Sequence, residues 1–169
     1  MCRRRVACAR TVYLVLVARK AEAEMFKHIM IATDGSELSQ IAVDKGLQLA
    51  KALGAEVTAV TVTPTWVSMA PAEVAMSFPV EEYVRATQVS AQAILSPIAD
   101  AAKQAGVTCV LRHEADQLPA QGILSAAKAT GSDLIVMSSH GRRGIKRLLL
   151  GSQAQEVLTH STIPVLIFR

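Results

Sequence analysis

Short apolar runs alternate with amphipathic segments along the chain from residue 25 onward. Five runs rich in Val, Ile and Ala are bounded by Gly, Pro, Asp or Ser, and this pattern predicts buried β-strands. They lie in the stretches "FKHIMIATDGS", "EVTAVTVTP", "VTCVLRH", "DLIVMSS" and "IPVLIF". Between them, apolar positions recur with the helical period, so strands and helices alternate.

Four helices are predicted in the intervening segments, at residues 37–53, 80–105, 118–130 and 152–160. A glycine follows each of the first three, as is common at helix C-termini. Pro97 is expected to interrupt or kink the second helix. The buried face of the first helix is predicted from its apolar positions: Leu38, Ile41, Ala42, Leu49, Ala52 and Leu53.

This alternation predicts an α/β fold with an open parallel sheet, right-handed crossovers and helices on both faces. The chain has 169 residues, of which 51% are hydrophobic and only 4% aromatic. These values suit one domain with a core of Val, Ile, Leu and Ala. Ligands of such sheets bind beyond the carboxyl ends of the strands, where the strand order reverses. The loops after the first and fourth strands are therefore the candidate site.

The connection at residues 63–79 contains three prolines and several large apolar side chains. It is too long for an ordinary connection and too apolar for a plain linker. Segments of this kind are often lids or partner-binding elements, and we interpret this one in that way.

The net charge of the chain is concentrated in residues 1–24, which hold six basic residues and two glutamates. This segment accounts for the whole net charge of +4, so residues 25–169 are formally neutral. A sequence pI near 9.2 would suggest a nucleic-acid partner if the charge lay on the folded domain. Because it lies on the leader, we expect no nucleic-acid partner.

The leader, residues 1–24, allows three interpretations. Its arginines, its apolar run "TVYLVLVA" and Ala21-x-Ala23 loosely imitate a secretory signal. Alternatively, "TVYLVLV" has the β-propensity of an extra strand. We favour a third interpretation, a non-native extension before a domain of residues 25–169, because Phe26 begins a complete first strand. The short apolar run cannot span a bilayer, which needs roughly 20 residues, so no membrane partner is expected.

The cysteines favour a reducing compartment. Of the three, Cys2 and Cys8 lie in the leader and Cys109 lies in the domain. A disulfide framework within the domain is therefore not expected, and we predict a cytoplasmic protein. Cys109 falls in an apolar run, where a thiol usually packs as an inert core side chain.

The loop after the fourth strand combines glycines with basic residues and leads into a helix N-terminus. Free N–H groups and the positive end of the helix dipole make phosphate a natural ligand there. Alternatively, the glycines only form turns and the charges lie on a solvated surface. Neither a Walker loop nor a dinucleotide fingerprint is present. The residues concerned are Gly141, Arg142, Arg143, Gly144, Lys146, Arg147 and Gly151.

Individual polar residues in these loops have structural alternatives. Asp34 could hydrogen-bond a sugar hydroxyl or a base edge, or it could cap the first helix in a capping box with Glu37. Ser152-x-x-Gln155 has the same capping pattern, and His140 is either a turn residue or a phosphate donor.

The sequence gives little support for a metal site or a catalytic group. One histidine and two carboxylates follow the third strand, at positions 113, 114 and 116, and they give weak grounds for a metal site. We see no nucleophile–base pair and no zinc spacing, so no catalytic residue and no metal ligand is predicted.

Four stretches together resemble the universal stress protein family, in the right order and over essentially all of residues 25–169. They are "IMIATDGSE", "EVTAVTV", "DLIVMSSHGRRGIKRLLLGS" and "IPVLIF". The nucleotide-binding branch of that family carries G-x-x-G, nine residues, then G-[ST]. Here the frame runs from Ser138 to Gly141, and after nine residues it ends at Gly151-Ser152. Ser138 replaces the first glycine, so the backbone approaches a ligand less closely, although its hydroxyl could add a contact.

The resemblance implies a five-stranded parallel sheet in the order 3-2-1-4-5, with the adenine nucleotide alpha-hydrolase-like fold. It also implies ATP or a related adenine nucleotide, with Mg²⁺ or Mn²⁺, between strands one and four. A homodimer through the C-terminal strand is implied as well, and a bare hydrophobic edge strand would favour it. By position, the nucleotide-binding residues would be Ala32, Asp34, Val62, Ser138, Gly141, Arg142, Gly151, Ser152 and Gln153.

Three functions are therefore considered. The first is an ATP-binding regulatory or stress-response protein with little or no turnover and an unidentified protein partner. The second is a nucleotide-free dimeric interaction module that uses residues 63–79. The third is an ATP-using enzyme, which would often carry S-G-G-x-D-S after the first strand, where this chain has Thr33-Asp34-Gly35-Ser36.

Overall fold

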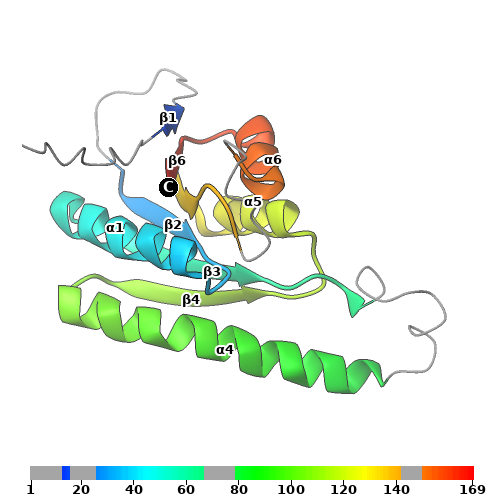
Figure 1. Ribbon diagram of the computed structural model, residues 1–169. Helices are drawn as coiled ribbons and strands as arrows, with labels where there is room; N and C mark the ends of the chain where they lie inside the picture. The colour runs from blue at the N-terminus through cyan, green and yellow to red at the C-terminus, as the bar shows by residue number, and fades with distance from the viewer. Residues whose placement is uncertain (1–12, 16–25, 67–78, 142–149) are drawn as a thin grey trace, which may run out of the picture.

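A computed structural model of the chain describes residues 13–15, 26–66, 79–141 and 150–169 (Figure 1). Its strands are β1 (Tyr13–Val15), β2 (His28–Ala32), β3 (Glu56–Val62), β4 (Cys109–Glu114), β5 (Leu134–Ser138) and β6 (Val165–Phe168). Its helices are α1 (Glu37–Leu53), α4 (Val80–Ala105), α5 (Pro119–Thr130) and α6 (Ser152–His160).

The sheet confirms the predicted topology. Its order is β1-β6-β5-β2-β3-β4, and the pairs from β6 to β4 are all parallel. Without β1, this is the predicted order 3-2-1-4-5 of the five expected strands. The order reverses between β2 and β5, where Ile31 lies opposite Val136.

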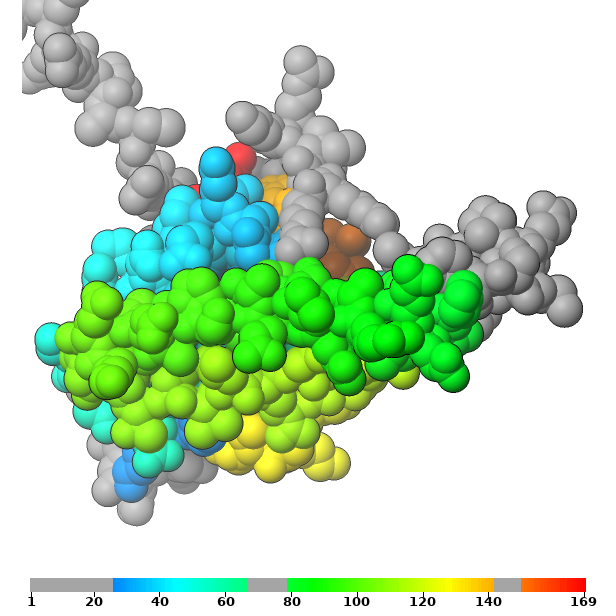
Figure 2. All heavy atoms as spheres, turned by 90° about the horizontal axis from the view of Figure 1, so that it is seen from below, coloured from blue at the N-terminus to red at the C-terminus, as the bar shows by residue number. Residues whose placement is uncertain are grey.

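Helices cover both faces of the sheet, as Figure 1 shows. Because successive side chains of a strand point to opposite faces, Ile29 and Ile31 join a core cluster with α1 and α4, whereas Met30 and Ala32 join a second cluster with α5 and α6. Figure 2 shows α4 lying along the first of these faces, beside α1. All four of these β2 side chains are buried, so the central strand is covered from both sides.

The helix boundaries also agree with the sequence pattern. Gly54, Gly106 and Gly131 end α1, α4 and α5 in the left-handed conformation, with φ of 66°, 73° and 66°. This conformation costs little without a Cβ. The expected interruption at Pro97 is wrong, because α4 continues past this residue to Ala105, whereas the alternative of a kink stays a prediction. No helix in the described ranges combines the length and the apolar sequence needed to cross a bilayer.

The buried face of α1 agrees only in part with the prediction: Ala42 is buried, Leu49 and Leu53 are partly buried against the core, and Leu38 is exposed. The buried residues of α1 are Ser39, Ala42, Val43, Gly46, Leu47 and Ala50. Gly46 lies directly against the sheet, since a Cβ placed there would be 2.6 Å from Ile31 Cδ1. The Ser39 hydroxyl is buried with hydrogen bonds to Thr33 Oγ1 (3.0 Å) and Ser36 O (2.8 Å). A glycine and a serine therefore lie at the interface, and a purely apolar pattern misses them.

Three residues of the leader form β1, which pairs antiparallel with β6 at one end of the sheet (Figure 1). This matches the extra-strand interpretation for Tyr13–Val15. It also removes the premise of a bare C-terminal edge, because β6 is paired on both sides. The homodimer through this strand stays a prediction.

Candidate functional site

The candidate site lies where β2 and β5 end side by side in the middle of the sheet. The helix that follows β2, α1, lies on one face of the sheet. The helix that follows β5 in the described chain, α6, lies on the opposite face. This is the strand-order reversal at which open α/β sheets bind ligands. The buried residue Ala32 closes β2, and Ser138 closes β5.

The first loop of the site is shaped by hydrogen bonds to its own backbone. Thr33 donates its N–H to Val60 O at 2.9 Å, and its hydroxyl oxygen accepts from Gly35 N at 3.1 Å. Asp34 Oδ1 accepts from Ser36 N at 3.0 Å, which makes an Asx turn. The carboxylate is thus held in place at the end of β2.

Asp34 is not the N-cap of α1, so that interpretation is wrong. The helix begins at Glu37, and Ser36 caps it by accepting from Ser39 N at 3.2 Å. Gly35, with φ of 77°, continues the turn between Asp34 and the cap. Asp34 therefore shapes the loop, and its second carboxylate oxygen faces the neighbouring loop.

Gly141 brings the two loops together. A Cβ placed on Gly141 would lie 2.5 Å from Asp34 Oδ2, a distance at which the carboxylate would have to move. The residue after His140 must therefore lack a side chain if Asp34 is to keep this position. Asp34 and Gly141, which come from two predicted site segments, meet in the structure.

Three consecutive polar residues at the end of β5 are buried: Ser138, Ser139 and His140. The Ser138 hydroxyl donates to His140 O at 2.7 Å, and the Ser139 hydroxyl lies 3.1 Å from His140 Nδ1. Ser139 N also donates to Phe168 O at 2.7 Å, which joins this turn to the end of β6. His140 Nε2 is buried and has no hydrogen-bond partner among the described residues.

Gly151 fixes the start of α6 against the same turn. Its N–H donates to Ser139 O at 2.8 Å, and a Cβ at this position would lie 2.9 Å from that oxygen. Gly151 is the N-cap residue, so the interpretation of Ser152 as the cap is wrong. The described residues offer no side-chain hydrogen bond to this cap. Such an N-terminus leaves backbone N–H groups to be satisfied by water or a ligand.

Two further predicted site residues, Gln153 and Val62, contact α5. Gln153 Oε1 accepts from Ala120 N at 3.0 Å, which links the first turn of α6 to the first turn of α5. Val62 lies at the end of β3, two residues beyond the residue that pairs with Ala32. Its side chain lies against Gly122, where a Cβ would be 2.6 Å from Val62 Cγ1.

The remaining predicted residue, Arg142, lies outside the described residues. So do the other residues of the nine-residue frame up to position 149, including Arg143, Gly144, Lys146 and Arg147. Two described residues at this edge, Thr33 and Ser139, were not predicted as site residues. Their signal in the sequence is a polar residue at or just after the end of an apolar strand.

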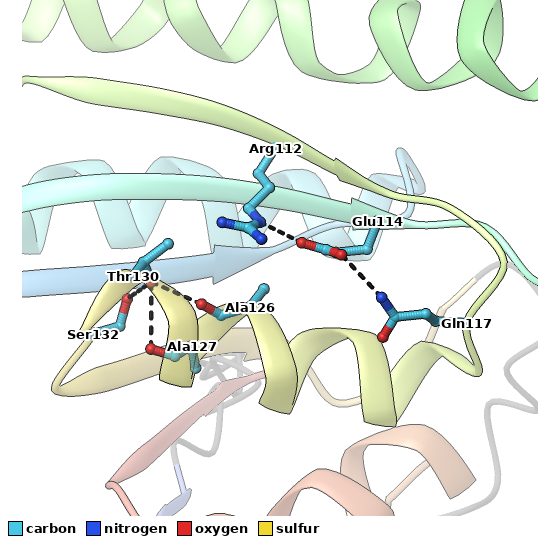
Figure 3. A network of polar contacts seen from close by, with 7 residues as sticks. All are labelled: Arg112, Glu114, Gln117, Ala126, Ala127, Thr130 and Ser132. Atoms are coloured by element: carbon cyan, nitrogen blue, oxygen red, sulfur yellow. Dashed lines mark hydrogen bonds and ion pairs between the residues drawn. The ribbon is translucent and has the colours of Figure 1, made fainter.

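His113 and Glu114, at the end of β4, have different partners, and Figure 3 shows those of Glu114. Glu114 contacts Arg112 Nε and accepts from Gln117 Nε2 at 3.0 Å, whereas His113 Nε2 lies 2.9 Å from Thr63 Oγ1. No group of three or more metal-binding side chains occurs within the described part of the chain.

The described beginning of the segment 63–79 is attached to α4. The Tyr83 hydroxyl donates to Pro64 O at 2.6 Å, and its ring lies 5.2 Å from the Trp66 ring. Burial, and then the negative charge of Asp116, raise the pKa of Tyr83 above its usual value. Residues 67–78, which carry most of the expected lid, lie outside the described residues.

Comparisons with known proteins agree on one family. A sequence model of the universal stress protein family matches residues 25–169. The chain is similar to universal stress protein YxiE of Bacillus subtilis, with 32% identity over 149 residues, 86% of this chain and 100% of that protein. Its fold is similar to the solved structure of MJ0577 of Methanocaldococcus jannaschii, with 27% identity and a TM-score of 0.71 over 85% of this chain and 96% of that one.

A further solved structure, a universal stress protein in complex with cAMP, is 28% identical with a TM-score of 0.60. The match covers 85% of this chain and 97% of that chain. The family model and these relatives span the same domain as the sheet and its helices. The chain therefore belongs to the universal stress protein family.

Proposed function

We propose that this protein binds an adenine nucleotide, ATP in particular, where β2 and β5 end, and that it acts as a regulatory or stress-response protein with little or no turnover. The observation that carries the proposal is the contact of Gly141 with the Asp34 carboxylate beside the N-terminus of α6. It brings a hydrogen-bond acceptor near a helix N-terminus to which the described residues offer no side-chain cap. The similar protein solved with cAMP supports an adenine nucleotide as the ligand class.

Each part of the site has a chemical role in this proposal. Asp34 accepts hydrogen bonds from a ribose hydroxyl or a base edge. The first N–H groups of α6 bind phosphate oxygens, favoured by the helix dipole. Ala32 and Val62 flank the adenosine, and Ser138 contacts the ribose or phosphates.

A divalent cation would be held chiefly by the nucleotide. Mg²⁺ commonly binds through one or two carboxylates together with phosphate oxygens. Asp34, just after β2, supplies a carboxylate at this edge. We therefore assign Mg²⁺ or Mn²⁺ to the phosphates of ATP.

The test begins with the full chain as purified. The protein is denatured, the supernatant is assayed for adenine nucleotide, and ATP with Mg²⁺ is titrated into nucleotide-free protein by calorimetry. Gly151→Val is expected to abolish binding, because the added side chain meets Ser139 O. Gly54→Ala is the matched control, because its φ of 66° strains an alanine while nothing lies within 4 Å of the added Cβ.

Comparing the two variants distinguishes loss of the binding site from loss of the folded structure. Loss of binding in Gly151→Val but not in Gly54→Ala, with cooperative unfolding in both, supports the phosphate site. Wild-type protein that carries no nucleotide and gives no heat at millimolar ATP with Mg²⁺ would overturn the proposal.

A second candidate, a nucleotide-free dimeric interaction module, is favoured by Ser138. Its hydroxyl donates to His140 O, so the turn is closed from within at the position of the family's first glycine. Under this alternative, Ser138→Gly would create ATP binding that the wild-type chain lacks. Measurable ATP binding of equal affinity in the two proteins would argue against the alternative.

A further inference from the structure

The two edges of the C-terminal strand are used by different partners. On one side β6 pairs parallel with β5, from Val165 opposite Ile135 to Phe168 opposite Ser138. On the other side it pairs antiparallel with β1, where Leu14 lies opposite Leu166. Figure 1 shows β1 at the end of the sheet, beside β6 and next to no other described strand.

Both faces of β6 are already covered by the rest of the domain. Val165 and Ile167 are buried in the cluster formed with α5 and α6. Leu166 and Phe168 are partly buried against the cluster formed with α1 and α4. Without β1, the backbone edge of β6 that faces away from β5 would therefore have no partner within the described domain. An apolar edge strand of this kind readily pairs with another chain.

The pairing of β1 with β6 of the same chain is short, and only a short segment connects β1 to the domain. Three residue pairs join β1 to β6, and ten residues separate Val15 from Phe26. Short tethers give effective concentrations in the millimolar range, so even a weak strand can occupy its site. Such a strand can also be displaced by a second copy that offers more pairs.

We propose that β1 occupies, within the same chain, the edge of β6 through which two copies would otherwise pair, so that the leader controls dimerisation. A chain with β1 docked cannot form a dimer through β6, because one edge pairs with one strand. Release of β1 exposes the edge to a second copy. The inference does not depend on nucleotide binding, and its tests are carried out without nucleotide.

The first test traps the pairing by a disulfide in the full chain. Cys2, Cys8 and Cys109 are replaced by serine, and Leu14→Cys is combined with Leu166→Cys. Residues directly opposite in an antiparallel pair have Cα atoms about 4.5–5.5 Å apart, which a disulfide can bridge. Leu14→Cys with Val89→Cys, on the exposed face of α4, is the matched control.

The expected product is an intrachain disulfide in the 14/166 variant and none in the control, seen by peptide mass spectrometry. The oxidised protein should sediment as a monomer at concentrations where the reduced protein dimerises. A disulfide that joins two chains, or no disulfide at all, would overturn the proposal.

The second test releases β1. Consecutive N–H groups of a strand point to opposite sides, so replacing both Tyr13 and Leu14 by proline removes at least one donor to β6. We expect the dimer dissociation constant, measured by sedimentation, to fall at least tenfold relative to wild type. Tyr13→Val with Leu14→Val keeps the donors and the β-propensity, and it should behave as wild type. An unchanged dissociation constant in the proline variant contradicts the proposal.

Discussion

At the residue scale, the candidate site depends on the absence of a side chain at Gly141. Gly141→Ala should displace the Asp34 carboxylate, because the new Cβ would lie 2.5 Å from its Oδ2 atom. The Asp34 side chain can rotate away, so the free energy of unfolding should fall by less than about 1 kcal/mol. Affinity for ATP should fall about tenfold, equivalent to about 1.4 kcal/mol, as measured by calorimetry.

Asp34→Asn is the informative comparison for this prediction. It keeps an oxygen that can accept from Ser36 N while it removes the charge. A loss of affinity in both variants assigns the effect to the carboxylate. Unchanged ATP affinity in Gly141→Ala would show that the carboxylate is not used.

Cys109 offers a residue-scale test of the core. Its side chain is half-buried against the cluster formed with α1 and α4, and burial raises the pKa of the thiol, partly offset by a hydrogen bond with the Ala59 backbone. Because the thiolate is the reactive form, alkylation in a Cys2→Ser, Cys8→Ser variant should be slower when folded than in urea at the same pH.

The sign of the linked stability follows from the direction of this shift. Folding favours the neutral thiol of Cys109, so its contribution to stability is present below the thiol pKa of the unfolded chain. It is lost as the pH rises from that value through the higher thiol pKa of the folded chain. Equal alkylation rates in folded and unfolded protein would contradict the buried environment of Cys109. The control is the same variant with Cys109→Ser, which has no thiol to alkylate.

At the element scale, two serines near the starts of helices have different roles. Ser36 accepts from Ser39 N as the cap of α1, whereas Ser152 is the first residue of α6 and follows its cap. Ser36→Ala should therefore lower the free energy of unfolding by about 1 kcal/mol. Ser152→Ala should change it by less than about 0.5 kcal/mol. Urea unfolding curves compare the two, and equal losses would contradict these cap assignments.

The sequence was sufficient to predict the elements and their order, because apolar strands and terminal glycines are local signals. It was also sufficient to predict that the loops after β2 and β5 lie together, since parallel strands align their carboxyl ends, whereas ligand binding there stays a prediction. It was not sufficient for the α1 face, because Ser39 and Gly46 are buried by packing against Thr33 and Ile31. The cap of α1 was misassigned because Gly35, with φ of 77°, places Ser36 rather than Asp34 before the helix, a backbone conformation that the capping pattern does not reveal.

At the scale of the whole molecule, the site joins two halves of the core. The cluster with α1 and α4 and the cluster with α5 and α6 meet across β2 and β5, which lie in the middle of the sheet. The two loops touch at Gly141 and Asp34, and Ser139 N extends the contact to Phe168 in β6. A ligand held here bridges elements that are far apart in the sequence.

This position predicts that ATP stabilises the whole domain. A ligand that binds only the folded state adds a free energy set by its concentration relative to Kd, about 2.7 kcal/mol at a hundredfold excess over Kd. Urea unfolding with and without ATP and Mg²⁺ should therefore show a shifted midpoint with an unchanged slope. Gly151→Val should unfold at one midpoint in both conditions, whereas Gly54→Ala should start lower and gain as much as wild type. A wild-type midpoint unmoved by saturating ATP would mean that no nucleotide bridges the two halves.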